Sequence, residues 1–147
     1  MKYATGLGRH VKGLSAEAEL VMKLRKHGII AFRCKQAGDN LAPDIIAVHR
    51  KFIMAIELRS FKKGNGKPSI PFKQLQRLVK LEDISGGRIS SYVVLAIDNE
   101  HNREWYIMPA RPLYMESQGR KSIVLSKARI ERYGTSLDRL LKVVAGA

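Results

Sequence analysis

The first segment with helical periodicity follows a glycine-rich, basic stretch at residues 1–13, which we expect to form a flexible arm. Ser15 is a suitable N-cap and Gly28 a suitable C-terminal stop, so a helix is predicted from about Ser15 to His27. One face of this helix carries four residues at the spacing i, i+3, i+4, i+7: Glu17, Leu20, Val21 and Leu24. Glu17 therefore lies at the end of an apolar stripe and points toward the rest of the fold.

A second helix is predicted to begin at Pro71, because proline suits the first turn of a helix. Its buried stripe is expected to consist of Leu75, Leu78 and Val79, and Gly86-Gly87 ends the segment. Thr135 or Ser136 is a candidate cap for a short last helix.

Apolar and β-branched runs between these helices predict strands. The expected strands are Ile29–Cys34, Asp44–Val48, Ile53–Arg59, Ser91–Ile97 and Glu104–Met108, with a further extended run at Ser122–Leu125. The order of helix, three strands, helix and two strands indicates an α/β fold with a central mixed β-sheet flanked by helices. The length of 147 residues suits one domain over residues 1–147.

The net charge of the chain limits the kinds of partner that are expected. The chain has 27 Lys and Arg against 13 Asp and Glu, a net charge of +14. This excess favours a nucleic-acid partner, since cations that neutralise phosphates dominate such binding; affinity for an anionic membrane is the alternative. No run approaches the ~18 apolar residues of a membrane span, so no membrane partner is expected. The single cysteine, Cys34, cannot form an internal disulfide, which favours a reducing cytoplasm.

Two carboxylates on neighbouring strands are the candidate functional residues. Asp44 follows Pro43 at the start of one strand, and Glu57 lies inside the next, where both faces are otherwise apolar. Simpler interpretations exist: Asp44 can bond its own loop, Glu57 can pair with Arg59, and Glu17 can serve the helix dipole.

Read together, these residues predict a site for Mg²⁺, with Mn²⁺ as an alternative. Asp44 and Glu57 offer hard oxygen ligands, and the carbonyl of Leu58 offers another. Glu17 would hold a more distant water or a second metal, and Arg59 would place positive charge beside a phosphorus centre.

The ordered motifs resemble the archaeal Holliday-junction resolvases of the PD-(D/E)xK nuclease superfamily. The matching segments are Lys12–Leu20, Lys26-His27-Gly28, Ala31-Phe32-Arg33, Pro43–Ala47, Ala55-Ile56-Glu57, Gln74 with Leu78, Trp105 and Ser136–Leu141. The resemblance implies a restriction-endonuclease-like fold. It also implies a metal-dependent, structure-selective endonuclease of DNA recombination and repair, a homodimer that binds a four-way DNA junction and nicks two strands symmetrically.

The resemblance also assigns residues. Glu17, Asp44 and Glu57 fall on the family's catalytic acidic positions, and Gln74 falls on a position near the active site. Arg59 falls on the position of the family's catalytic Lys, and this is the important departure from the family's pattern. Arg keeps the positive charge of Lys but cannot lose a proton and act as a base. A junction-binding protein without catalysis is therefore an alternative, and a basic RNA-binding domain is a third.

DNA contacts are expected from two groups of basic residues. Arg9, Lys12, Arg33 and Lys35 surround the site in the sequence, and Lys62, Lys63 and Lys67 lie in the loop after the Glu57 strand. A dimer interface is expected from apolar residues of the second helix or of the Tyr92–Ile97 strand.

Overall fold

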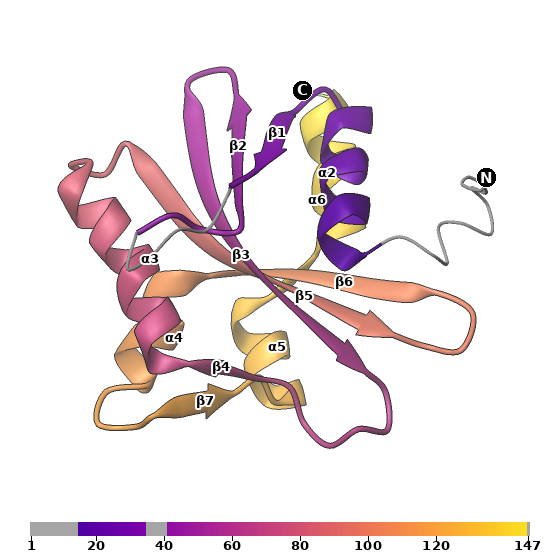
Figure 1. Ribbon diagram of the computed structural model, residues 1–147. Helices are drawn as coiled ribbons and strands as arrows, with labels where there is room; N and C mark the ends of the chain where they lie inside the picture. Colours follow the sequence, from indigo (N-terminus) through magenta and orange to yellow (C-terminus); the bar gives the residue numbers. More distant parts are fainter. Residues whose placement is uncertain (1–14, 35–40, 147) are drawn as a thin grey trace.

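The computed structural model describes residues 15–34 and 41–146. Labels follow Figure 1. The strands are β1 (Ile30–Arg33), β2 (Ile45–His49), β3 (Phe52–Lys62), β4 (Ser69–Pro71), β5 (Ile89–Asp98), β6 (Arg103–Pro109), β7 (Ser122–Val124) and β8 (Thr135–Ser136). The helices are α2 (Ala16–Lys26), α3 (Phe72–Ile84), α4 (Ala110–Glu116), α5 (Lys127–Tyr133) and α6 (Leu137–Gly146). The predicted arm at residues 1–13 lies outside the described residues.

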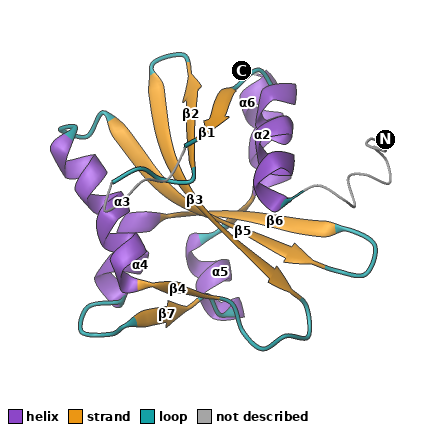
Figure 2. Ribbon diagram, in the orientation of Figure 1, coloured by secondary structure: helices purple, strands orange, loops and turns teal. Residues whose placement is uncertain are grey.

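A central six-stranded sheet has the order β1-β2-β3-β5-β6-β8 (Figure 2). β3 and β5 pair in parallel, with Glu57 opposite Val93, and every other pair in this sheet is antiparallel. The predicted mixed α/β sheet is therefore confirmed. The parallel pair places β3 and β5 at the centre, where both faces are covered.

Two apolar cores lie on opposite faces of the sheet. α2 and α6 cover one face, where Leu20, Leu24 and Leu137 pack on alternate strand residues such as Ile56 and Val94. The helices α3 and α4 cover the other face, and their core residues Leu75, Leu78 and Leu113 pack on Ala55, Val93 and Leu95. Successive residues of β3 and β5 thus point to different cores, as the period of a strand requires.

Local signals set several helix ends as predicted. Ser15 caps α2, because its hydroxyl oxygen accepts a hydrogen bond from the Ala18 amide at 3.1 Å. Ser136 caps α6 in the same way, accepting from the Arg139 amide at 3.3 Å. Leu75, Leu78 and Val79 form the buried stripe of α3, as the spacing predicted.

Four elements were not predicted. β4 pairs with β7 in a separate two-stranded sheet, where the sequence indicated only a loop before Pro71. β8 pairs with β6 in the central sheet, where the sequence indicated only a helix cap. α4 contains Pro112, which is tolerated because it lies in the first turn. α5 has no buried residue, so it has no apolar stripe for a periodicity argument to detect.

One prediction about an interface was wrong for the strand. The Tyr92–Ile97 strand is the central β5, and its residues Val93 to Ala96 are fully buried within the chain, so they cannot supply a dimer contact. The apolar stripe of α3 faces the sheet, but Ile84 at the end of this helix is 65% exposed, so the prediction for the helix stays a prediction. Other large exposed apolar residues of the described chain include Ile30, Phe52 and Val143.

Candidate active site

Glu57 lies on the central strand, on the face that α3 covers. It shares this face with Ala55 because side chains alternate along β3, and Ala55 belongs to the core beneath α3. Only 7% of Glu57 is exposed. Burial, and after it the charge of the Asp44 carboxylate, raise the pKa of Glu57 to about 7, while Arg77 and Arg59 oppose the shift. The site thus holds a carboxyl whose charge is poorly compensated by the protein alone.

Asp44 is held in register with β3. Ile45 pairs with Ile56, and beyond this pair the Asp44 Oδ2 atom accepts a hydrogen bond from the Leu58 amide at 2.8 Å. The Asp44 carboxylate thus bonds the neighbouring strand, unlike a turn-forming Asp that bonds its own loop. Because the N–H and C=O of one strand residue point to the same side, the Leu58 carbonyl also points toward Asp44.

The pKa of Asp44 is raised, chiefly by burial and also by the charge of Glu17. The Leu58 amide, Arg59 and Arg77 lower it. Two partly buried carboxylates with raised pKa values, beside a strand carbonyl, form an oxygen donor set that suits a hard divalent cation.

Glu17 approaches the site from the opposite face of the sheet. It lies in the first turn of α2, and its Oε1 atom accepts a hydrogen bond from Arg33 Nε at 2.9 Å. Its charge is close enough to raise the pKa of Asp44. No group of three or more His, Cys, Asp or Glu side chains within residues 15–34 and 41–146 is arranged to hold a metal ion. The structure therefore places Asp44 near enough to raise the pKa of Glu57, pairs Glu17 with Arg33, and does not gather the three acids into one metal-binding group.

Arg59 does not pair with Glu57. Its Nε atom donates a hydrogen bond to the Ser69 carbonyl of β4 at 3.1 Å, and no ion pair joins it to an acid in the described part of the chain. Its charge still lowers the pKa of both Asp44 and Glu57. The β4 backbone therefore fixes the direction of Arg59 while its charge remains directed at the site.

The helix α3, which packs on the Glu57 face of the sheet, carries two polar side chains of interest. Gln74 has a buried Oε1 atom, which is the only buried side-chain oxygen or nitrogen of the described residues that lacks a hydrogen-bond partner. Arg77, one helical turn later, lies near enough to lower the pKa of Asp44 and Glu57. The sequence singled out Gln74 through the resemblance but missed Arg77, because the helical pattern placed it away from the buried stripe.

The predicted DNA contacts fall into three groups. Arg9, Lys12 and Lys35 lie outside the described residues. Arg33 is exposed but is the partner of Glu17. Lys62, Lys63 and Lys67 are exposed. Lys62 is the last residue of β3, the strand that carries Glu57 and Arg59, and the other two lie in the loop between β3 and β4.

Cys34 lies next to Asp44. Its amide donates to the Asp44 carbonyl at 2.9 Å. Burial raises the pKa of the Cys34 thiol, and the charges of Asp44 and Glu17 add to this effect. A thiol with a raised pKa is a poor nucleophile, so this residue contributes packing at the site.

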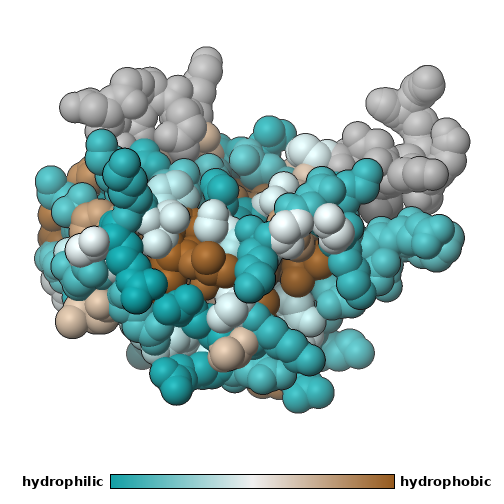
Figure 3. All heavy atoms as spheres, turned by 90° about the horizontal axis from the view of Figure 1, so that it is seen from below, coloured by the Kyte–Doolittle hydropathy of each residue, from teal (hydrophilic) through white to brown (hydrophobic). Residues whose placement is uncertain are grey.

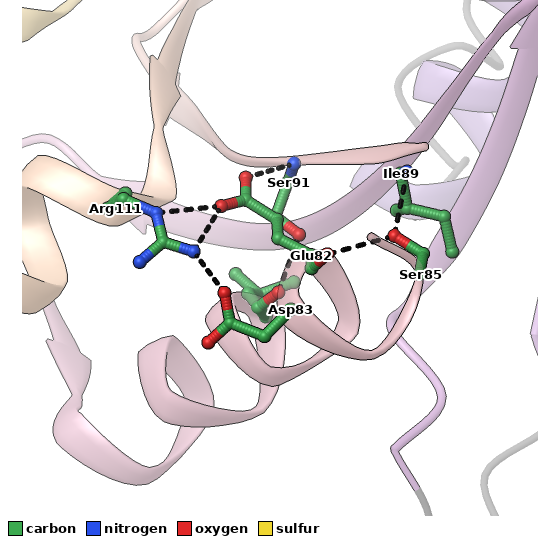
Figure 4. Close-up of polar contacts among 7 residues, drawn as sticks. Glu82, Asp83, Ser85, Ile89, Ser91 and Arg111 are labelled. Atoms are coloured by element: carbon green, nitrogen blue, oxygen red, sulfur yellow. Dashed lines mark hydrogen bonds and ion pairs between the residues drawn. The ribbon is translucent and has the colours of Figure 1, made fainter. Parts of the chain in front are cut away.

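A second cluster of acids is structural. Figure 4 shows Glu82 and Asp83 at the end of α3, facing Arg111 of α4. The Glu82 oxygens accept from Arg111 Nε at 3.1 Å and from the Ser91 amide at 2.8 Å, and Asp83 accepts from Arg111 Nη2 at 2.7 Å. Since protein donors satisfy these carboxylates, the cluster fixes α3 against β5 and α4 and offers no open metal site.

Comparisons with known proteins agree with the sequence motifs. Residues 9–146 match the family model described as archaeal Holliday junction resolvase (Hjc). A protein of Sulfolobus acidocaldarius, crossover junction endodeoxyribonuclease Hjc, is 33% identical over 86 residues. That match covers 56% of this chain and 59% of the relative.

The fold is similar to a solved structure from the archaeal hyperthermophile Archaeoglobus fulgidus, Hjc, a Holliday junction resolvase. The TM-score is 0.66 at 21% sequence identity, and the match covers 85% of this chain and 96% of the other. This likeness concerns the fold alone.

Proposed function

Since this chain belongs to the archaeal Holliday junction resolvase family, we propose that it is an endonuclease that resolves four-way DNA junctions by metal-dependent hydrolysis of phosphodiesters. The observation that carries this proposal is the pairing of Asp44 with Glu57. Both carboxyls have raised pKa values, they lie beside the Leu58 carbonyl, and two arginines direct positive charge at them.

The donor set fits Mg²⁺ or Mn²⁺, which Asp44, Glu57 and the Leu58 carbonyl would hold. Such an ion supplies Lewis-acid chemistry and a bound water of lowered pKa. The chain's own residues do the rest. The Leu58 amide orients Asp44, and burial shields the reacting groups from bulk water. The unpaired Gln74 oxygen would accept a hydrogen bond from a water molecule of the site.

The two remaining residues of the proposed site carry different charges. Arg59 would stabilise the negative charge that develops on the phosphate. Glu17 is paired with Arg33 in this structure. When Arg33 binds a DNA phosphate instead, the Glu17 carboxylate would be free to turn toward Asp44 and hold a water or a second metal ion. Lys62, Lys63 and Lys67 would contact the backbone of the junction and set its position.

The proposed enzyme acts as a homodimer, because two symmetric nicks require two active sites. The surface that supports this assembly is an exposed apolar patch where α6 meets the edge of the sheet. It consists of Phe52, Leu140 and Val143, which are between 36% and 66% exposed. Phe52 and Leu140 also line an apolar pocket between α6 and the sheet.

Cleavage of a labelled four-way junction in Mg²⁺ tests the proposal. We expect the unaltered chain to nick the junction and to leave a duplex of the same sequence intact. Asp44→Asn and Glu57→Gln should each reduce the single-turnover rate by at least about 100-fold and leave junction affinity within a few fold. Asp83→Asn, which removes a carboxylate outside the site, is the matched control and should cleave normally. Equal rates in all four proteins would contradict the assignment.

A junction-binding protein without catalysis is the second candidate, and the observation that favours it is Arg59. An arginine does not act as a base, and here the Ser69 carbonyl holds its Nε atom. Tight junction binding without nicking in either Mg²⁺ or Mn²⁺ would select this candidate, and recovery of nicking in Arg59→Lys would identify the cause. If structured RNA competes and junction DNA does not, the partner is RNA instead.

A further inference from the structure

Arg77 is a cation that has no hydrogen-bond or ion-pair partner among the described residues. It lies on α3, the helix that packs against β3 on the face of Glu57. Other partly buried arginines of the described chain are engaged: Arg59 donates to the Ser69 carbonyl, Arg103 pairs with Glu19 and Asp98, and Arg129 pairs with Glu116. Within residues 15–34 and 41–146, Arg77 is also partly buried, yet it makes no hydrogen bond or ion pair.

The acids on which the Arg77 charge acts show that its guanidinium lies on the side of α3 that faces the site. Its guanidinium acts on both Asp44 and Glu57, and on Glu57 its effect exceeds that of Arg59. Lys73 and Lys80 on the same helix are exposed and have no such effect on either acid. Arg77 is therefore the cation of α3 that faces the site, one turn after the unpaired oxygen of Gln74.

Hydrolysis of a phosphodiester would give the free guanidinium of Arg77 a role. A phosphodiester attacked by water gains negative charge on its non-bridging oxygens, and a guanidinium is suited to bind two such oxygens at once. Arg59 has one donor committed to Ser69, which restricts its position, whereas all five donors of Arg77 are available. Two arginines on different elements can thus approach one phosphate from different sides.

We propose that Arg77 is a catalytic residue whose guanidinium contacts the non-bridging oxygens of the phosphate at the cut. This inference rests on the proposed function. Arg77 shares with Arg59 the cationic role that the family assigns to a single lysine position.

The first test measures single-turnover cleavage of the four-way junction at saturating Mg²⁺. Arg77→Ala should cleave about 100-fold more slowly, and Arg77→Lys should recover part of the rate because it keeps the charge without the fork. Arg77→Gln keeps most of the side-chain volume and should be as slow as Arg77→Ala. Lys80→Ala, which removes an exposed cation of the same helix, should cleave within about twofold of the unaltered chain. If Arg77 only balances the charge of Asp44 and Glu57, saturating metal will replace it, and the rate of Arg77→Ala will be normal.

The second test does not depend on cleavage. Junction affinity is measured against salt concentration in Asp44→Asn, with and without Arg77→Ala. Loss of one phosphate contact should reduce the slope of log K against log salt by about 0.9. An unchanged slope overturns the inference even if no variant cleaves. A normal rate in Arg77→Ala overturns it while the proposed function stands. An inactive unaltered chain overturns the proposed function and with it the catalytic role of Arg77, and the salt slope then shows only whether Arg77 contacts a phosphate.

Discussion

At the scale of single residues, the cost of burying Glu57 is the dominant feature. A carboxylate that is 7% exposed on a central strand is unfavourable when ionised, and neither arginine pairs with it directly. An ionisable group at this buried position does not stabilise the fold, so its presence indicates a functional role at the site.

This burial predicts how stability depends on pH. The pKa of Glu57 rises from 4.5 in the unfolded chain to about 7 in the fold, so the folded state binds more protons between these values. The free energy of unfolding should therefore fall as pH rises through this window, by about 3 kcal/mol at most. Glu57→Gln should lack this part of the slope, so the variant gains stability relative to the unaltered chain from pH 4.5 to pH 8.

Urea unfolding with a chelator at several pH values measures this effect. Glu131→Gln, an exposed carboxylate of α5, is the matched control and should keep the slope of the unaltered chain. Added Mg²⁺ should stabilise the unaltered chain at pH 8 more than at pH 5, because the metal binds the ionised form. Identical slopes with Glu57 and with Gln at this position would show that the carboxyl ionises normally.

At the scale of elements, α3 is the part whose position matters most. It carries Gln74 and Arg77, and its second half is fixed to the start of β5 by backbone and side-chain bonds. The Ser91 hydroxyl donates to the Leu78 carbonyl at 2.7 Å, the Ser91 amide donates to Glu82, and the Ile89 amide donates to the Ser85 hydroxyl at 3.0 Å. Figure 4 shows this junction of α3, β5 and α4.

Ser91→Ala tests this attachment. The hydroxyl is buried, and its loss should lower the free energy of unfolding by about 1 kcal/mol, since the Leu78 carbonyl loses a donor that water cannot replace. Ser90→Ala, which removes a neighbouring hydroxyl that makes no hydrogen bond in the described chain, should change stability by less than about 0.5 kcal/mol. Thermal or urea unfolding compares the two. Equal losses would mean that the bond to α3 contributes little.

At the scale of the whole molecule, the positive charge and the exposed apolar surface point to two different partners. The net charge of +14 favours an anionic polymer as partner, and Figure 3 shows one face covered mainly by hydrophilic residues with a smaller apolar area among them. None of the described helices is long and apolar enough to cross a bilayer. The exposed apolar patch of Phe52, Leu140 and Val143 is the surface feature that binding to an anionic polymer does not explain.

Phe52→Lys tests the role of this patch. We expect the unaltered chain to sediment as a dimer at micromolar concentration and the variant as a monomer, because a charge at the centre of an apolar interface lacks a partner. Met115→Lys places the same charge on a different exposed apolar residue, on α4, and should leave the dimer intact. Loss of coordination between the two nicks should accompany dissociation. A dimer that survives Phe52→Lys would place the interface elsewhere.

The sequence by itself determined the elements and the chemistry of the candidate residues. Period and capping located α2, α3 and the long strands, because those signals act within a few residues. The position of Glu57 within an apolar run identified it as a costly, buried acid. Short elements such as α5 and β4 carry no such signal, since packing against distant segments stabilises them.

Only the tertiary structure decided which side chains meet. The hydrogen bond from Leu58 to Asp44 depends on strand register, the pairing of Glu17 with Arg33 depends on the edge of the sheet, and the approach of Arg77 depends on how α3 lies on β3. Each involves a direction set by packing between segments remote in the chain. Electrostatic interaction depends on distance in space, and the spacing of residues along a sequence does not contain that distance.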